Sequence, residues 1–274
     1  MPKICAGIVT YNPNIELLGE NINSIIDQVE VIYLVDNGSN NINEIKRRFN
    51  KSTIFIIEND SNLGIAAALN QLCGKGIDEG YDWILTLDQD SVSPNDLVKS
   101  LISYEDDKVA IIAPNIVYKN NENYSDNVSS GTKEVEWVIT SASLTNLKIW
   151  KVLGGFDEKL FIDGVDRDYG MRAARAGYKV LKCFDVKLLH ELGNLNCKRR
   201  FGRTIYVTNH SPFRKYYMAR NAIYLDKKHG TSIAIKYNVK NIIETMLYED
   251  NKTEKLCSIF KGIKDGVELA KGIR

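Results

Sequence analysis

The segment Tyr81-Asp-Trp-Ile-Leu-Thr-Leu-Asp-Gln-Asp-Ser91 joins an apolar run to two carboxylates that directly follow it. The apolar run is typical of an interior parallel strand, and ligands bind outside the carboxyl ends of such strands. Because side chains two residues apart on a strand point the same way, Asp88 and Asp90 can offer two oxygen ligands to one Mg²⁺ or Mn²⁺ ion. The alternative is a pair of turn or capping acids, since Ser91 and Ser93-Pro94 can begin a helix.

The composition is that of an ordinary globular protein with 274 residues, 44% of them hydrophobic. Lys and Arg number 36 and Asp and Glu 35, so the net charge of +1 gives no general attraction for nucleic acid. The five cysteines lack the CxxC spacing of a zinc or redox motif, which favours inert thiols in a reducing compartment. No apolar run reaches the roughly 20 residues of a membrane span, and none resembles a signal peptide. We therefore expect a cytoplasmic protein, soluble or peripheral at the inner face of the cell membrane.

Apolar runs and stretches of helical spacing alternate along the first ninety residues. Short apolar runs at 4–11, 31–36 and 53–57 precede the run at 81–88, and helical spacing fills the intervals. This alternation predicts an α/β fold, with a mostly parallel, Rossmann-like sheet flanked by helices and right-handed crossovers. The stretch 136–143 predicts a further strand, and residues 213–274 predict a helical C-terminal extension that carries two apolar stripes.

Polar residues follow the predicted strands at Thr10, Asp36, Asn62, Asp88 and Asp90. Each one alone is typical of a turn or a cap, but the carboxyl ends of parallel strands share one edge of a sheet. Together these residues predict a binding rim. The turn after the first strand reads Tyr-Asn-Pro-Asn rather than GxGxxG, and no GxxxxGK[ST] occurs, which argues against glycine-loop recognition of phosphate. Phosphate binding would then rest on a metal ion and side chains.

Four short motifs occur in order between residues 4 and 91. They are Ile8-Val-Thr-Tyr-Asn12, Val35-Asp-Asn-Gly-Ser39, Asn62-Leu-Gly64 with Ala66-Ala-Ala-Leu-Asn70, and Leu85-Thr-Leu-Asp-Gln-Asp-Ser91. Together they resemble the motifs of family 2 glycosyltransferases with the GT-A fold, most closely the bacterial rhamnosyltransferase branch.

This resemblance implies roles for most of the rim. Asp36 would hold the nucleoside base of a nucleotide-sugar donor, and Asp88 and Asp90 would hold a divalent cation, Mn²⁺ or Mg²⁺, on its diphosphate. The other donor-binding residues that we expect are Thr10, Tyr11, Asn62 and Gly64.

A second acidic segment lies between residues 155 and 172. Carboxylates there have an ordinary role, because they stabilise a helix N-terminus and pair with an Arg one turn later. By resemblance, Val165-Asp166 occupies the place of the family's general base, and because the usual Glu before that Asp is absent, Asp163 stays open as the alternative. Such a base accepts the proton of a sugar hydroxyl as it attacks. With one carboxylate acting as a base, a single displacement with inversion at the anomeric carbon is expected.

The same branch has a His-x-x-Gly sequence near the metal or diphosphate, which His190 matches, and a Tyr-Tyr-x-x-Arg-Asn sequence, which Arg220 and Asn221 match. Without the resemblance, a lone histidine such as His190 is more often a structural hydrogen bonder. Arg220 could equally be an exposed residue on a helix face. We expect a catalytic domain at 1–212, with a nucleotide-sugar-binding half at 1–110 and an acceptor-binding half at 111–212, and a helical region at 213–274.

The expected function is that of an inverting, metal-dependent glycosyltransferase. It would move a sugar onto a cell-surface polysaccharide or lipid-linked glycan. The sugar that we expect is L-rhamnose, with dTDP-rhamnose as the donor. The alternatives are a UDP-sugar donor in the same type of pathway and a non-catalytic sugar-nucleotide or glycan-binding module. A nucleotidyltransferase would carry a glycine-rich loop after the first strand, which this chain lacks. The amphipathic tail is expected to pack on the catalytic domain or in a homodimer, or to rest on an anionic membrane.

Overall fold

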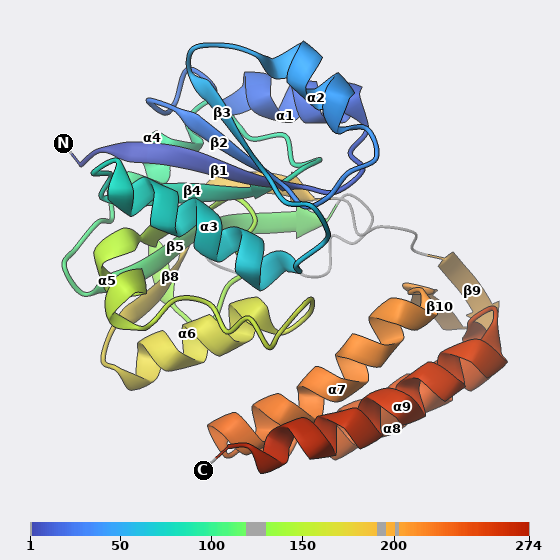
Figure 1. The fold of residues 1–274 in the computed structure, drawn as a ribbon. Coiled ribbons are helices and arrows are strands. Elements are labelled where there is room, and N and C mark those ends of the chain that lie inside the picture. The colour runs from blue at the N-terminus through green and yellow to red at the C-terminus, as the bar shows by residue number, and fades with distance from the viewer. Residues whose placement is uncertain (1, 119–129, 191–195, 201–202, 274) are drawn as a thin grey trace. The chain divides into compact units, whose positions relative to one another are not determined.

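The computed structural model describes residues 2–118, 130–190, 196–200 and 203–273 (Figure 1). For residues 118, 190, 196–200 and 203–206 it describes the backbone alone. The chain forms two compact units. The first comprises Met1–Lys159 and Val165–His190, and the second comprises Leu160–Gly164 and Glu191–Arg274.

The first unit is built on a mixed sheet. Its strands are β1 (Ile4–Thr10), β2 (Ile32–Asp36), β3 (Ile54–Glu58), β4 (Trp83–Asp88), β5 (Val109–Tyr118), β6 (Thr132–Glu134), β7 (Ser143–Asn146) and β8 (Lys179–His190). The spatial order is β3-β2-β1-β4-β7-β5-β8-β6. Strands β1 to β4 are parallel, β7 is antiparallel to both β4 and β5, β8 is parallel to β5, and β6 is antiparallel to β8. The predicted parallel sheet is therefore confirmed in its N-terminal half.

Helices cover both faces of this sheet (Figure 1). On one face lie α1 (Ile15–Ile25), α2 (Ile42–Phe49) and α4 (Leu97–Ile102), whose buried side chains share one core cluster with the strands. On the other lie α3 (Ile65–Asp78), α5 (Leu147–Val152) and α6 (Val165–Arg175). Gly7 in β1 allows α3 to approach closely, because a Cβ there would lie 2.9 Å from a methyl group of Leu72. This layered α/β architecture is the one that the sequence predicts.

The strand predicted at 136–143 is wrong in its position, because the strand β7 begins only at Ser143. The residues before it form an irregular turn in which Ala142 is fully buried with φ of +58°, a conformation that is costly for a residue with a side chain. Side-chain hydrogen bonds hold this turn: the hydroxyls of Thr86 and Ser143 both donate to the carbonyl of Thr140. In this turn, hydrogen bonds from side-chain hydroxyls therefore take the place of backbone pairing between strands.

The second unit is mainly helical, as predicted. It contains a hairpin of β9 (Asn196–Arg200) and β10 (Arg203–Val207), followed by α7 (Pro212–His229), α8 (Ala234–Tyr248) and α9 (Lys252–Lys271). Gly262 and Gly266 bring α9 against α7, because a Cβ at Gly262 would lie 2.3 Å from the carbonyl oxygen of Tyr216. The buried carboxylate of Glu249 accepts hydrogen bonds from the buried ammonium groups of Lys215 and Lys255. This triad ties the unit together.

Helix α8 presents its apolar stripe outward. Ile235 is 80% exposed, and Val239, Ile243, Met246 and Leu247 are also exposed. The buried side of α8 carries Ala234, Asn238, Asn241 and Thr245 instead. Packing of this stripe on the catalytic domain or on a second subunit stays a prediction, and so does contact of the C-terminal helices with a membrane.

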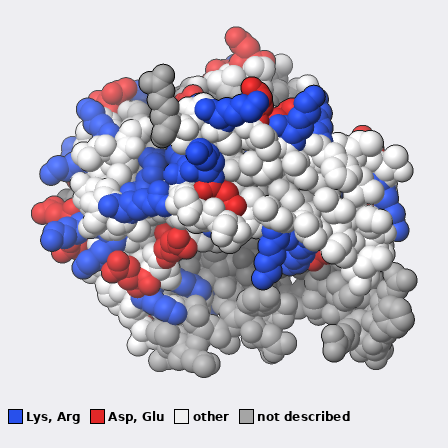
Figure 2. Space-filling model, turned by 90° about the horizontal axis from the view of Figure 1, so that it is seen from below, with Lys and Arg blue, Asp and Glu red and all other residues white. Residues whose placement is uncertain are grey.

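In Figure 2 the charged side chains gather mainly on the left of the described surface, where acidic and basic groups lie side by side, and the surface to the right is largely uncharged. Within the described ranges, no helix is both long enough and apolar enough to cross a bilayer.

Candidate active site

Three parallel strands end side by side at the predicted rim. Thr10, the last residue of β1, is paired in register with Asp36, the last residue of β2. On the other side of β1, Val9 is paired with Asp88, the last residue of β4. Because parallel strands share their carboxyl ends, three of the residues that the sequence predicts converge on one edge of the sheet.

The Asp36 carboxylate is buried and held at both oxygens. The hydroxyl of Thr10 donates to Oδ1 at 2.9 Å, and the backbone N–H of Ser39 donates to Oδ2 at 2.8 Å. Gly38 makes the turn with φ of +81°, where a Cβ would lie 2.8 Å from the backbone of Ser61. Each carboxylate oxygen has two lone pairs, so a further donor from a ligand can still be accepted.

A network of amides lies beside Asp36, and Asn62 is the one of its side chains that the sequence analysis named as a binding residue. Asn62 Oδ1 accepts from Asn37 Nδ2 at 3.0 Å and from the N–H of Gly64 at 2.9 Å. Asn59 donates to both Asn37 and Gln71. Asn62 and Gly64 therefore shape the turn before α3. Asn37 could have been identified from the sequence, because it belongs to the Val35-Asp-Asn-Gly-Ser39 motif.

The acidic triplet, Asp88-Gln89-Asp90, follows the apolar part of β4 and is held by hydrogen bonds to the backbone of Asp88 and to the side chain of Gln89. Asn21 Nδ2 donates to the carbonyl of Asp88, and Gln89 Oε1 accepts from the backbone N–H of Tyr11 at 2.9 Å. Asp88 and Asp90 themselves are exposed. The prediction that both lie on one strand and point the same way is wrong, because β4 ends at Asp88 and Asp90 lies in the turn after it. Gln89 is a residue that sequence reasoning missed, and it joins the turn after β1 to the acids.

Two exposed carboxylates fit a divalent cation that takes its other ligands from a substrate. Among the residues whose side chains the structure describes, no three His, Cys, Asp or Glu side chains come together as a metal site. Asp88 and Asp90 are the described residues that could hold such a cation, and Mg²⁺ in proteins usually takes its remaining ligands from substrate phosphates and water. The side chain of His190, at the end of β8, lies outside the described residues.

Asp166 lies in the first turn of α6 and belongs to the first unit. Its Oδ1 accepts a hydrogen bond of 2.9 Å from the hydroxyl of Thr140. Asp168, two residues later, is fully buried and pairs with Arg172 at 2.8 Å across one helical turn. Asp168 thus has the ordinary role expected of carboxylates in this segment, pairing with an Arg one turn later, while Asp166 is only partly buried.

Asp163 belongs to the second unit and is occupied by an ion pair there. Both of its carboxylate oxygens accept from the Arg214 guanidinium, at 2.9 Å for the shortest contact, and its φ is +65°. Asn221 is buried and donates to the backbone carbonyls of Ile162 and Asp163, at 2.7 Å each. These contacts fix the conformation of the segment 160–164.

Arg220 lies on aromatic rings of its own helix. Its guanidinium carbon is 4.6 Å from the ring centre of Tyr217, and its Nε donates to the side chain of Asn221 at 2.8 Å. The ring of Tyr217 is stacked on Phe161, with centres 5.1 Å apart. The roles predicted for Arg220 and Asn221 at the substrate stay predictions.

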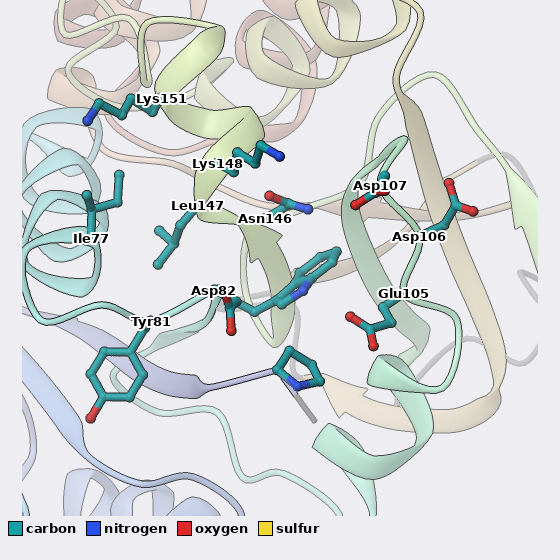
Figure 3. Close-up of a pocket in the computed structure, with 12 residues that line it drawn as sticks. Ile77, Tyr81, Asp82, Glu105, Asp106, Asp107, Asn146, Leu147, Lys148 and Lys151 are labelled. Carbon is teal, nitrogen blue, oxygen red and sulfur yellow. The ribbon is translucent and has the colours of Figure 1, made fainter.

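A hollow of about 870 Å³ opens at the opposite edge of the sheet (Figure 3). It is lined by Pro2, which precedes β1, and by Asp82 and Trp83 at the start of β4, with Asn146 and Lys151 from the β7–α5 region. Trp83 begins β4 and Asp88 ends it, so this hollow lies at the other end of the strands from the rim described above.

Residues 5–165 match the family described as Glycosyl transferase family 2. The chain belongs to this family. The region that matches contains the whole rim, from Thr10 to Asp90, and the turn of Thr140. This family 2 glycosyltransferase is also 29% identical over 286 residues to the dTDP-rhamnosyl transferase RfbF of Shigella flexneri. That alignment covers 97% of this chain and 95% of the relative.

Solved structures share the fold of this family 2 glycosyltransferase. The S. aureus TarS 1–349 structure in complex with UDP-GlcNAc has a TM-score of 0.62 at 14% identity, covering 99% of this chain and 83% of that one. The GalNAc-T7 structure with UDP, GalNAc and Mn²⁺ has a TM-score of 0.60 at 12% identity, covering 91% of this chain and 58% of that one. The predicted GT-A fold is thereby confirmed.

Proposed function

We propose that this glycosyltransferase moves L-rhamnose from dTDP-rhamnose onto a cell-surface polysaccharide or a lipid-linked glycan. The observation that carries the proposal is the likeness to the dTDP-rhamnosyl transferase RfbF, which extends over 97% of the chain. The rim agrees with a nucleotide-sugar donor, because the buried carboxylate of Asp36 and the exposed carboxylate of Asp88 end two strands on either side of β1, and the exposed Asp90 follows in the turn after β4. The four cysteines with described side chains are free thiols, which fits action in the cytoplasm.

In this proposal the donor lies along the rim from Asp36 to Asp90. Asp36 accepts the imide N–H of thymine, a donor that cytosine lacks. Asp88 and Asp90 would hold a divalent cation, which would supply positive charge against the charge that develops on the leaving diphosphate. The role of His190 near the same diphosphate is proposed from its His-x-x-Gly sequence alone.

Asp166 is the proposed general base, and the transfer inverts the anomeric carbon. Its carboxylate accepts the proton of the acceptor hydroxyl while that oxygen attacks the sugar. The alternative, Asp163, is less suited to this role, because both of its oxygens pair with Arg214.

The donor proposal is tested by calorimetry of dTDP-rhamnose and UDP-GlcNAc, each with and without Mn²⁺. Tighter binding of dTDP-rhamnose, together with its turnover in the presence of a glycan acceptor, supports the proposal. Preference for UDP-GlcNAc would identify a UDP-sugar transferase. Donor binding without turnover under any acceptor would identify a non-catalytic binding module.

The base is tested by comparing Asp166→Asn with Asp163→Asn. Asp166→Asn should keep donor affinity while transfer falls by about 10² to 10⁴-fold, the usual contribution of a general base. Asp163→Asn breaks an ion pair and should affect stability more than transfer. An active Asp166→Asn beside an inactive, donor-binding Asp163→Asn would give the role to Asp163.

A further inference from the structure

The turn Thr140–Ser143 lies between the acidic end of β4 and the helix α6 and bonds to both. The hydroxyl of Thr140 donates to Asp166 at 2.9 Å, and the hydroxyl of the next residue, Ser141, accepts from the backbone N–H of Asp88 at 3.2 Å. The Ser141 hydroxyl is also 3.0 Å from that of Ser91, which follows the acidic triplet. Two consecutive side chains therefore reach the two proposed chemical centres.

The turn itself is held rigidly. The carbonyl of Thr140 accepts from the hydroxyl of Thr86 at 2.6 Å and from that of Ser143 at 2.8 Å. Ala142 is fully buried in the left-handed region, a conformation that persists only where surrounding contacts enforce it. Thr140 and Ser141 are buried as well, so their hydroxyls have few other arrangements available.

We propose that Thr140 is the positioning residue of the general base and that Ser141 is the positioning residue of the cation-binding acids. This inference rests on the proposed function, because it presumes the roles of Asp166 and Asp88. Thr140 holds one oxygen of Asp166 and favours the ionised form of the carboxylate, which is the form that accepts a proton. Ser141 fixes the backbone of Asp88 and thereby the direction of its side chain.

The proposal predicts that neighbouring substitutions have different effects. Thr140→Val keeps the shape of the side chain but removes the donor, so transfer at neutral pH should fall by about tenfold. The acid limb of its kcat/KM profile should move upward by about 1 pH unit, while donor affinity is kept. Thr140→Ser retains a hydroxyl and should restore the wild-type profile. Ser141→Ala should instead weaken Mn²⁺-dependent donor binding and leave the acid limb in place.

A double-mutant cycle with Asp166→Asn distinguishes loss of positioning of the base from a general loss of folding or activity. In the Asp166→Asn background there is no ionisable base to hold, so Thr140→Val should cost no further activity. An unchanged acid limb in Thr140→Val, or a full additional loss in the double variant, overturns the proposal. If Thr140→Val does not fold, Thr140→Ala takes its place, and the same two outcomes decide. A wild type that transfers no sugar would refute the proposed function, whereas an active Asp166→Asn would refute only the base.

Discussion

Thr10 and Asp36 face each other across β1 and β2, and the threonine hydroxyl donates to the buried carboxylate at 2.9 Å. The same carboxylate receives the backbone N–H of Ser39. Asp36 therefore has a structural task, which is to hold the turn after β2, in addition to its proposed contact with the nucleoside base. The two tasks have to be separated by choosing substitutions that spare the turn.

Asp36→Asn should weaken binding of dTDP by about 10- to 100-fold, because an acceptor for the imide N–H of thymine is lost and hydrogen bonds to charged groups are strong. The preference for dTDP over CDP should fall in parallel. Calorimetry with both nucleotides measures this. Thr10→Val is the matched control, since it disturbs the same carboxylate without removing it. Equal preference for dTDP in Asp36→Asn and wild type would refute the assignment.

Asp88→Asn and Asp90→Asn should each weaken Mn²⁺-dependent nucleotide binding. Loss of an outer partner of a metal ligand typically costs about 10- to 100-fold in affinity, so loss of a ligand should cost at least that much. Asp96→Asn, a change at an exposed acid before α4, is the control and should be silent. Nucleotide titrations with and without Mn²⁺ provide the comparison. Full activity of the wild type in a chelator would contradict a role for the metal.

Gly170→Ala should destabilise the first unit. A Cβ at Gly170 would lie 2.6 Å from the Cβ of Trp137 and 2.7 Å from the carbonyl of Glu136, so the segment that leads to Thr140 must move. The expected cost is about 1–3 kcal/mol, as for other overpacked sites. Gly74→Ala in α3 is the matched control, because nothing lies within 4 Å of its added methyl group. There we expect stabilisation by roughly 0.5–1 kcal/mol, measured as urea unfolding.

The stability of the second unit should depend on His210 between about pH 6.5 and pH 4. Burial, followed by the positive charge of Arg214, lowers the pKa of His210 from 6.5 to about 4. Because the unfolded chain binds this proton at higher pH than the folded chain, the contribution is complete above pH 6.5 and is lost as the pH falls towards 4. His210→Gln should flatten that part of the curve of unfolding free energy against pH. Identical curves would contradict the assignment.

The amino-acid sequence by itself determines the layered α/β fold and the line of polar residues along one rim. Both follow from local patterns, because apolar runs select strands and parallel strands necessarily end at a common edge. It also locates the acidic helix start at Asp166. The position of the short strand β7 escaped prediction, because buried hydroxyls rather than apolar periodicity hold the turn before it.

The tertiary structure alone decided how the candidate site is assembled. The contact of Tyr11 with Gln89 spans 78 residues, that of Thr140 with Asp166 spans 26, and the pair of Asp163 with Arg214 spans 51. Local periodicity carries no information about such distant partners, since a polar residue after a strand looks the same whether it caps a turn or meets a carboxylate. Packing within each unit brings these side chains within hydrogen-bond distance, so that Asp163 pairs with Arg214 in one unit and Asp166 accepts from Thr140 in the other.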